Sequence, residues 1–157
     1  MQDRFKFRFW FKDTQEMIYS EKFNDVQTLG QWLFEDRKDV VKMQCTGLKD
    51  KKCKLIYEGD VVKDLTYSYN VRYLCVFAPI FGGLGLMSIQ NWKDYNFCRE
   101  NWEDYYSNSE VRRLDNRFKL ANQGNKLKCF SMRELKMSDY EVIGNIYQDK
   151  ELLNDSN

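Results

Sequence analysis

The alternation of aromatic and charged side chains in residues 4–11 most constrains how this chain can fold. The segment reads Arg-Phe-Lys-Phe-Arg-Phe-Trp-Phe, so a phenylalanine falls at every second position. Successive side chains of a strand point to opposite faces. The pattern therefore predicts a strand with one apolar face and one face that its cations, Arg8 among them, keep in water. Turn-forming residues 12–15 and apolar residues 17–19 complete a predicted β-hairpin.

Most of the remaining chain also has the patterns of strands. Residues 71–78 form a nearly continuous apolar and aromatic run, which is typical of a strand buried on both faces. Residues 24–39 hold apolar side chains at helical spacing, although Gly30 weakens that pattern. Further strands are predicted where short apolar runs are bounded by turn residues, at 40–44, 55–57, 61–62, 84–89, 127–132 and 140–147.

The stretch from 91 to 126 departs from strand patterns. Aromatic and apolar side chains recur there every three or four residues, which predicts amphipathic helices at about 92–106 and 110–122. Asn91 is the predicted N-cap of the first helix. Strands before and after this helical insertion predict a mainly β fold, α+β by content, with the helices across one opening of a barrel or against one sheet.

Short glycine-containing turns are predicted to hold this fold together. In the Glu-Gly-Asp sequence, Gly59 allows a backbone conformation that other residues avoid, and Asp60 can pin the turn through backbone amides. Gly47 and Gly144 mark two further turns. We expect the two chain ends to join in a single closed sheet, with the segment around Gly59 beside the segment around Gly144.

Composition excludes several functional classes. The chain has 157 residues, the size of one domain or of one domain with an insertion. Its 25 Lys and Arg against 24 Asp and Glu give no global attraction to nucleic acid or membrane. Histidine is absent, which removes the commonest general base and metal ligand. The five cysteines, none in a CxxC pair, and the polar, charged beginning of the chain predict a reduced cytoplasmic protein without zinc, disulfides or a membrane span.

A lysine-rich loop predicted at 47–54 is a candidate nucleic-acid-binding site. Cations interleaved with exposed aromatic rings can hold a single strand by phosphate attraction and base stacking. The alternative, which strand alternation favours, is that the aromatic side chains of the first strand face the core and the charged ones only solubilise the surface. The candidate residues are Lys49, Lys51, Lys52 and Lys54.

Aromatic side chains on the predicted helices form a candidate protein-binding surface, because Trp and Tyr are enriched at binding hot spots. The alternative is that these side chains dock on the chain's own barrel, as amphipathic stripes usually do. The candidate residues are Trp92, Tyr95, Trp102 and Tyr105.

Catalytic chemistry has weak support. The glycines of residues 81–86 are followed by another predicted strand, whereas a phosphate loop needs a helix there. Glu100, Glu103 and Asp104 alternate with cations, as on a solvated helix face. A hydrolase or nuclease is therefore a distant third interpretation, and we expect neither catalytic residues nor a cofactor or metal.

Three ordered blocks, at 44–51, 56–62 and 141–147, together resemble the YopX family of phage and prophage proteins. The first hairpin and the later Glu-Leu-Leu sequence at 151–153 resemble that family as well. One departure lies in the loop, where Lys52 and Cys53 replace the usual Asn-Gly. A type I′ turn needs positive φ at both positions, so another loop geometry is predicted.

The resemblance implies an SH3-like β-barrel or roll with an N-terminal β-hairpin, in a phage or prophage protein of Gram-positive bacteria that self-associates. It implies no activity and no catalytic residues. We expect an N-terminal hairpin region at 1–57 that packs on a barrel at 58–157, with the helical insertion at about 91–126. The expected function is binding, to a second copy or to a phage or host protein in the host cytoplasm. The alternative is a nucleic-acid-binding module.

Overall fold

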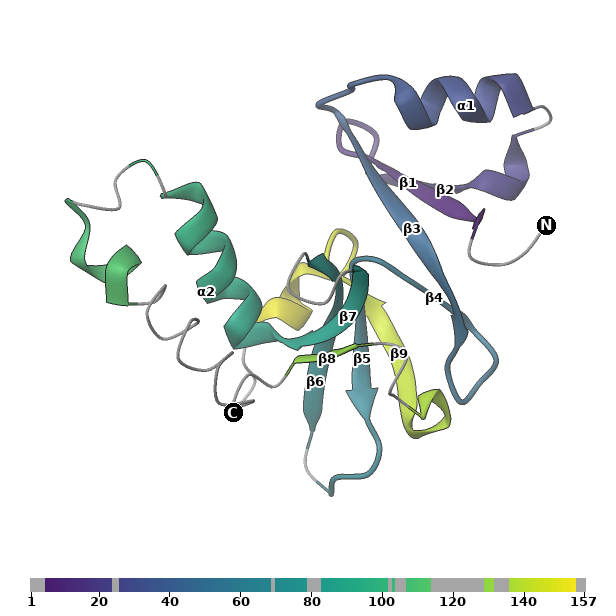
Figure 1. Ribbon diagram of the computed structural model, residues 1–157. Coiled ribbons are helices and arrows are strands. Elements are labelled where there is room, and N and C mark those ends of the chain that lie inside the picture. Colours follow the sequence, from purple (N-terminus) through teal and green to yellow (C-terminus); the bar gives the residue numbers. More distant parts are fainter. Residues whose placement is uncertain are drawn as a thin grey trace.

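The residues that the structure describes form two antiparallel β-sheets with few helices, so the mainly β fold class is confirmed (Figure 1). The computed structural model describes residues 5–23, 26–68, 70–78, 83–101, 103, 107–113, 129–131 and 136–154. A four-stranded sheet has the order β2-β1-β3-β4, and a five-stranded sheet that curves into a half-barrel has the order β8-β7-β6-β5-β9. The expectation of a single closed sheet is therefore wrong, because the first hairpin belongs to a sheet of its own.

The predicted hairpin is present, as β1 (Phe7–Phe11) paired with β2 (Glu16–Tyr19). It is covered by α1 (Val26–Phe34), which the helical spacing had indicated. Edge-to-face aromatic contacts join the helix to the strand, with 5.2 Å between the ring centroids of Phe11 and Trp32. The end of α1 is held by Lys42, whose ammonium donates to the carbonyl oxygen of Leu33 at 2.8 Å.

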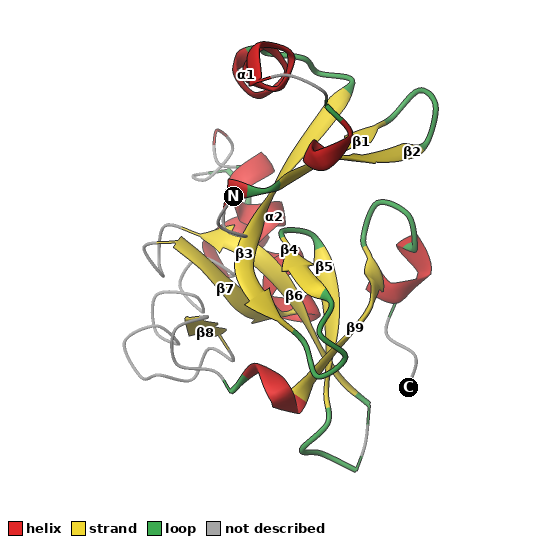
Figure 2. Cartoon of the chain, turned by 90° about the vertical axis from the view of Figure 1, so that its right-hand side faces the viewer, coloured by secondary structure: helices red, strands yellow, loops and turns green. Residues whose placement is uncertain are grey.

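The long strand β3 (Val40–Lys49) connects this N-terminal unit to the rest of the molecule. Its first half pairs with β1, and its second half pairs with β4 (Leu55–Tyr57). Figure 1 shows β3 running from the unit of α1, β1 and β2 toward the five-stranded sheet, and the turned view in Figure 2 agrees. The chain passes from one sheet to the other at the turn of Glu58 and Gly59. The division into two domains at this point stays a prediction.

The five-stranded sheet pairs segments that are far apart in the sequence. β5 (Asp60–Asp64) lies between β6 (Val71–Ala78) and β9 (Tyr140–Asn145), and Val61 pairs with Gly144. This confirms the prediction that the segment around Gly59 lies beside the segment around Gly144. β7 (Gly83–Ser88) and β8 (Cys129–Ser131) complete the sheet. Among the described residues, 3-10 helices lie outside the sheets at Ser20–Lys22, Met137–Asp139 and Lys150–Leu153.

Both faces of this sheet are buried, which explains the unbroken apolar run of β6. One face packs Val62, Tyr73 and Cys75 into a core closed by Met137 and Tyr140. The other face is covered by α2 (Ile89–Glu100) and by the last 3-10 helix. The side chains in that second core are Val61, Leu74, Val76, Met87, Ile89 and Ile146, with Trp92, Tyr95, Tyr147, Leu152 and Leu153 packed against them.

The helix α2 begins three residues earlier than predicted. Ser88, and not Asn91, is its N-cap, because the Ser88 hydroxyl accepts the amide of Asn91 at 3.3 Å. The helix ends at Glu100, short of the predicted 106. Of the predicted second helix at 110–122, only residues 110–113 are described, and they are helical.

The predicted loop at 47–54 is shorter than expected, since residues 47–49 belong to β3. Gly47 has a φ of 78° at the irregularity between Cys45 and Lys49. At the tip of the loop, Cys53 has a φ of 63°, while Lys52 is not in the left-handed region. The loop is therefore not a type I′ turn. This agrees with the prediction, made from Lys52 and Cys53, that the loop has another geometry.

Gly144 was predicted to mark a turn, but it lies within β9, and a glycine is needed there because of crowding. A β-carbon there would lie 2.5 Å from Leu152 and 2.6 Å from the carboxylate of Asp149. That carboxylate accepts the amide of Asn145 at 2.9 Å, so the glycine makes room for the group that closes the end of β9.

Candidate functional site

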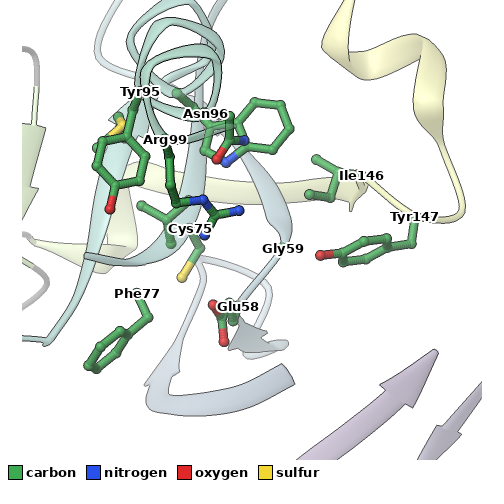
Figure 3. A pocket seen from close by; sticks show the side chains of 12 residues that line it. Glu58, Gly59, Cys75, Phe77, Tyr95, Asn96, Arg99, Ile146 and Tyr147 are labelled. Atoms are coloured by element: carbon green, nitrogen blue, oxygen red, sulfur yellow. The ribbon is translucent and has the colours of Figure 1, made fainter. Parts of the chain in front are cut away.

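A cavity of about 160 Å³ lies between α2 and the turn that joins the two sheets. Figure 3 shows Tyr95 and Arg99 extending into it from α2, and Tyr147 entering from the opposite side. The floor is formed by Glu58, Gly59 and Cys75, and the exposed ring of Phe77 lies at its edge. The remaining lining residues are Val76, Met87, Trp92, Asn96 and Ile146.

Gly59 positions the floor of this cavity. Its φ of +80° lets the chain turn from β4 into β5. A β-carbon there would lie 3.0 Å from the side-chain amide nitrogen of Asn145 and 3.2 Å from the ring of Tyr147. The amide of Ile146 donates to the Gly59 carbonyl at 3.0 Å, which fixes the segment that carries Tyr147. The turn and the end of β9 are therefore held together by backbone contacts.

Ionisable groups in the cavity are shifted by burial. Burial raises the pKa of the Glu58 carboxyl, although the backbone amides of Phe77 and Gln44 oppose this. Burial also raises the pKa of the Tyr147 phenol; the nearby Glu58 raises it further, and Arg99 opposes the shift. The pKa of the Cys75 thiol is raised well above its usual range, again chiefly by burial. The thiol therefore stays protonated and is a poor nucleophile.

A wider hollow of about 760 Å³ adjoins this cavity on the far side of Tyr147. It lies between the turn of the first hairpin and the last 3-10 helix, and its lining includes Trp10, Lys12, Gln15 and Lys150. Because Tyr147 lines both spaces, they are neighbours. We call the cavity and the hollow together the aromatic groove.

A buried ion pair joins the first hairpin to the floor of the groove. The Arg8 guanidinium contacts the Asp60 carboxylate, and their side chains are only 4% and 1% exposed. Arg8 also donates to the Glu58 carbonyl at 3.2 Å. Asp60 accepts the amide of Tyr57 at 2.8 Å and the side-chain amide of Asn145 at 3.3 Å. Burial raises the pKa of the Asp60 carboxyl, and the guanidinium opposes that shift.

The prediction that Arg8 faces water is therefore wrong. Strand alternation placed Arg8 opposite the phenylalanines correctly, but the barrel covers that face of β1 as well. Asp60, predicted to pin its turn, does accept a turn amide, and it also neutralises a cation from a strand about 50 residues away. No local pattern in the sequence links these two residues.

The predicted nucleic-acid-binding lysines are divided between two places. Lys51 and Lys52 contact the Glu141 carboxylate on β9, with N–O distances of 3.3 Å and 2.5 Å. Lys49 and Lys54 line a different pocket, between the first hairpin and β4. We call this second space the basic pocket.

Asp50 holds that lysine loop in shape. Its carboxylate is buried, and it accepts the amides of Lys52 at 2.8 Å, Lys54 at 2.9 Å and Val142 at 2.9 Å. The loop is thus tied to β9 by hydrogen bonds as well as by ion pairs.

The candidate protein-binding residues that the structure describes are in the aromatic groove. Trp92 and Tyr95 are half-buried and pack against the second core, and both line the cavity. Trp102 and Tyr105 lie outside the described residues. Sequence reasoning missed Glu58, Phe77, Arg99 and Tyr147, because they converge from four separate segments.

Within the described part of the chain, the acidic and sulfur side chains form no group of three or more that could hold a metal ion. None of the helices described has both the length and the apolar character that a membrane span requires.

Comparison with known proteins gives the family. No curated protein matches the chain significantly. Among solved structures, protein yopX from Bacillus subtilis is 14% identical over 96% of this chain and 99% of that one, with a TM-score of 0.49. Protein EF1440 from Enterococcus faecalis is 17% identical over 95% and 97%, with a TM-score of 0.42. The family model described as YopX protein matches residues 6–154, so the chain belongs to the YopX family.

Proposed function

We propose that this protein acts by binding a segment of a partner protein in the aromatic groove, and not by catalysis. The observation that carries the proposal is the position of Tyr147, which joins a narrow cavity to a wider hollow. Aromatic side chains and an arginine surround this junction, and these residue types dominate protein-binding hot spots.

The size of the cavity favours a protein segment over a small molecule. Its volume of about 160 Å³ is below the roughly 300–1,000 Å³ of typical small-molecule sites, but it suits a single anchoring side chain. The rest of the segment would extend across Tyr147 into the hollow beside Trp10. The carboxylate of Glu58 and the guanidinium of Arg99 offer an acceptor and donors for the polar backbone of the segment.

The edge of the cavity offers apolar surface for such a partner. Phe77 is 57% exposed although it belongs to the core strand β6. A partner with an aliphatic or aromatic anchor would cover this ring and Tyr95 together. The protonated state of Cys75, whose thiol pKa is raised by burial, supports binding over nucleophilic chemistry.

Selection from a displayed random-peptide library tests the proposal. We expect enriched peptides to share one large apolar residue, and to lose binding to the Phe77→Ala and Arg99→Ala variants. Phe34→Ala is the matched control, because the Phe34 ring is 89% exposed on α1, away from the groove. Peptides that depend on Phe34 and ignore Phe77 and Arg99 would contradict the proposal, as would a library that yields no enriched sequence.

The family assignment supports three further parts of the proposal: an origin in a phage or prophage, a place of action in the host cytoplasm, and a second copy of the chain as one candidate partner. Light scattering of the purified protein tests self-association. A monomer at all concentrations would leave a phage or host protein as the partner.

A further inference from the structure

The most exposed large apolar side chain among the described residues is Phe34, the last residue of α1. Its ring is 89% exposed. The helix is held on β1 by other rings, since Phe11 and Trp32 make the edge-to-face contact between them. The Phe34 ring is therefore available to a partner, and aromatic side chains are enriched at the centres of protein interfaces.

The backbone on both sides of Phe34 is held in place. The ammonium of Lys42 on β3 donates to the carbonyl oxygen of Leu33 at 2.8 Å, and also to the carbonyl oxygen of Glu35. The amide of Glu35 donates to the carbonyl oxygen of Gln31 at 2.9 Å. The ring is thus presented on a fixed corner of the fold, so its insertion into a partner would cost little conformational entropy of the backbone.

The cavity of the aromatic groove has the size of a phenyl ring. A protein cavity of about 150 Å³ is large enough to bind benzene. The cavity here has a volume of about 160 Å³, and its lining includes Phe77, Trp92 and Tyr95. Phe34 lines neither the cavity nor the hollow of its own chain. A Phe34 ring that enters the groove must therefore come from a second copy.

Charged groups beside the ring and at the cavity have opposite signs. The two residues after Phe34 are acidic, and the guanidinium of Arg99 extends into the cavity (Figure 3). Among the described residues, neither Asp36 nor Arg99 belongs to an ion pair, whereas Arg37 is already paired with Asp39. Because Asp36 is two residues from the ring, insertion of the ring would bring its carboxylate to the mouth of the cavity, where Arg99 lies.

We propose that Phe34 of one molecule inserts into the aromatic groove of a second copy of the chain, where Asp36 pairs with Arg99 of that copy. This inference rests on the proposed function, because it names the partner of the same groove. The ring and the groove are different parts of the chain, so the contact is head to tail. Each pair of molecules then keeps one free ring and one free groove, and association continues into a closed ring or an open row of molecules.

Analytical ultracentrifugation of mixed variants tests this geometry. Phe34→Ala removes the inserting ring and keeps the groove, whereas Arg99→Glu keeps the ring and changes the groove. Each variant alone should self-associate at least about tenfold more weakly than the natural protein. Their equimolar mixture should form a dimer and nothing larger, because only one ring and one intact groove can meet. The matched control is Phe5→Ala, which removes a 54% exposed ring that lines neither space and should change self-association less than about twofold.

A charge exchange separates the ion pair from the ring. Asp36→Arg alone should self-associate about tenfold more weakly, and its mixture with Arg99→Glu should regain the association of the natural protein. A natural protein that is monomeric at every concentration, or a mixture of Phe34→Ala and Arg99→Glu that forms no dimer, would overturn the inference. If library peptides still bound such a monomer through Phe77 and Arg99, the proposed function would stand without it. If they did not, both would fail.

Discussion

The buried pair of Arg8 and Asp60 makes a quantitative prediction about the joint between the two sheets. Asp60→Asn keeps the shape of the side chain and one acceptor oxygen, but it leaves the guanidinium buried without a counter-charge. Removing one partner of a buried pair costs about 3–5 kcal/mol of folding free energy. Arg8→Met keeps the length of the side chain and leaves the carboxylate alone, so it should cost a similar amount.

The double variant distinguishes this explanation from simple loss of contacts. Additive effects would cost about 6–10 kcal/mol, but with neither charge present the double variant should cost no more than either single one, about 3–5 kcal/mol. The coupling energy should thus be at least about 3 kcal/mol. Because small domains are stable by only about 5–15 kcal/mol, the single variants should be compared in a stabilising osmolyte.

Urea denaturation followed by tryptophan fluorescence is a suitable assay, since Trp10 neighbours Arg8 on β1 and is buried. All four proteins should unfold with equal dependence on urea, so that differences in midpoint report stability. Additive losses in the double variant would refute the reasoning, because they would mean that Arg8 and Asp60 contribute independently.

Three further predictions concern single positions. Cys53→Gly should raise stability by about 0.5–1 kcal/mol in the same assay, because a glycine adopts the left-handed backbone conformation at this position without strain. Cys53→Ala should give no such gain, and equal gains from both variants would contradict the explanation. Gly144→Ala should lower the free energy of unfolding by about 1–3 kcal/mol because of overpacking. Gly30→Ala, with open space around it in α1, should raise that free energy by about 0.5–1 kcal/mol. A tolerated Gly144→Ala would be inconsistent with the crowding described. The ammonium of Lys52 lowers the pKa of Glu141, so the ion pair stabilises the fold above the ordinary carboxyl range and this contribution is lost as pH falls through the lowered pKa. Carboxyl NMR titration should show that Lys52→Gln raises the Glu141 pKa, and an unchanged titration would argue against the ion pair.

Local patterns in the sequence predicted the elements whose own residues show which side chains are buried. The alternation in residues 4–11 predicted a strand with one apolar face, and the apolar run of β6 predicted a strand that is buried on both faces. The boundaries of α2 were less accurate, because the aromatic spacing that indicated the helix begins at Trp92. The capping hydroxyl of Ser88 lies before it, at the end of a strand, and carries no helical pattern of its own.

The sites depend on contacts that no local pattern contains. Arg8 looked like a surface cation, because alternation assigns a residue to a face but does not say what covers that face. The cluster of loop lysines was visible in the sequence, yet the fold divides it and joins Lys49 and Lys54 with Lys6. Tyr147 was visible only as part of a strand, and its place at the junction of two hollows requires the whole tertiary structure.

The pairing of β5 with β9 has a consequence for synthesis on the ribosome. Asp60 pairs with Asn145, so one edge of β5 stays open until almost the entire chain has emerged, whereas the N-terminal unit has all its strand partners by Lys49. The nascent chain therefore carries an unprotected strand edge for most of its synthesis, and such edges recruit other chains. A message truncated before the codon for Tyr140 should therefore yield aggregates, because β9 is then missing.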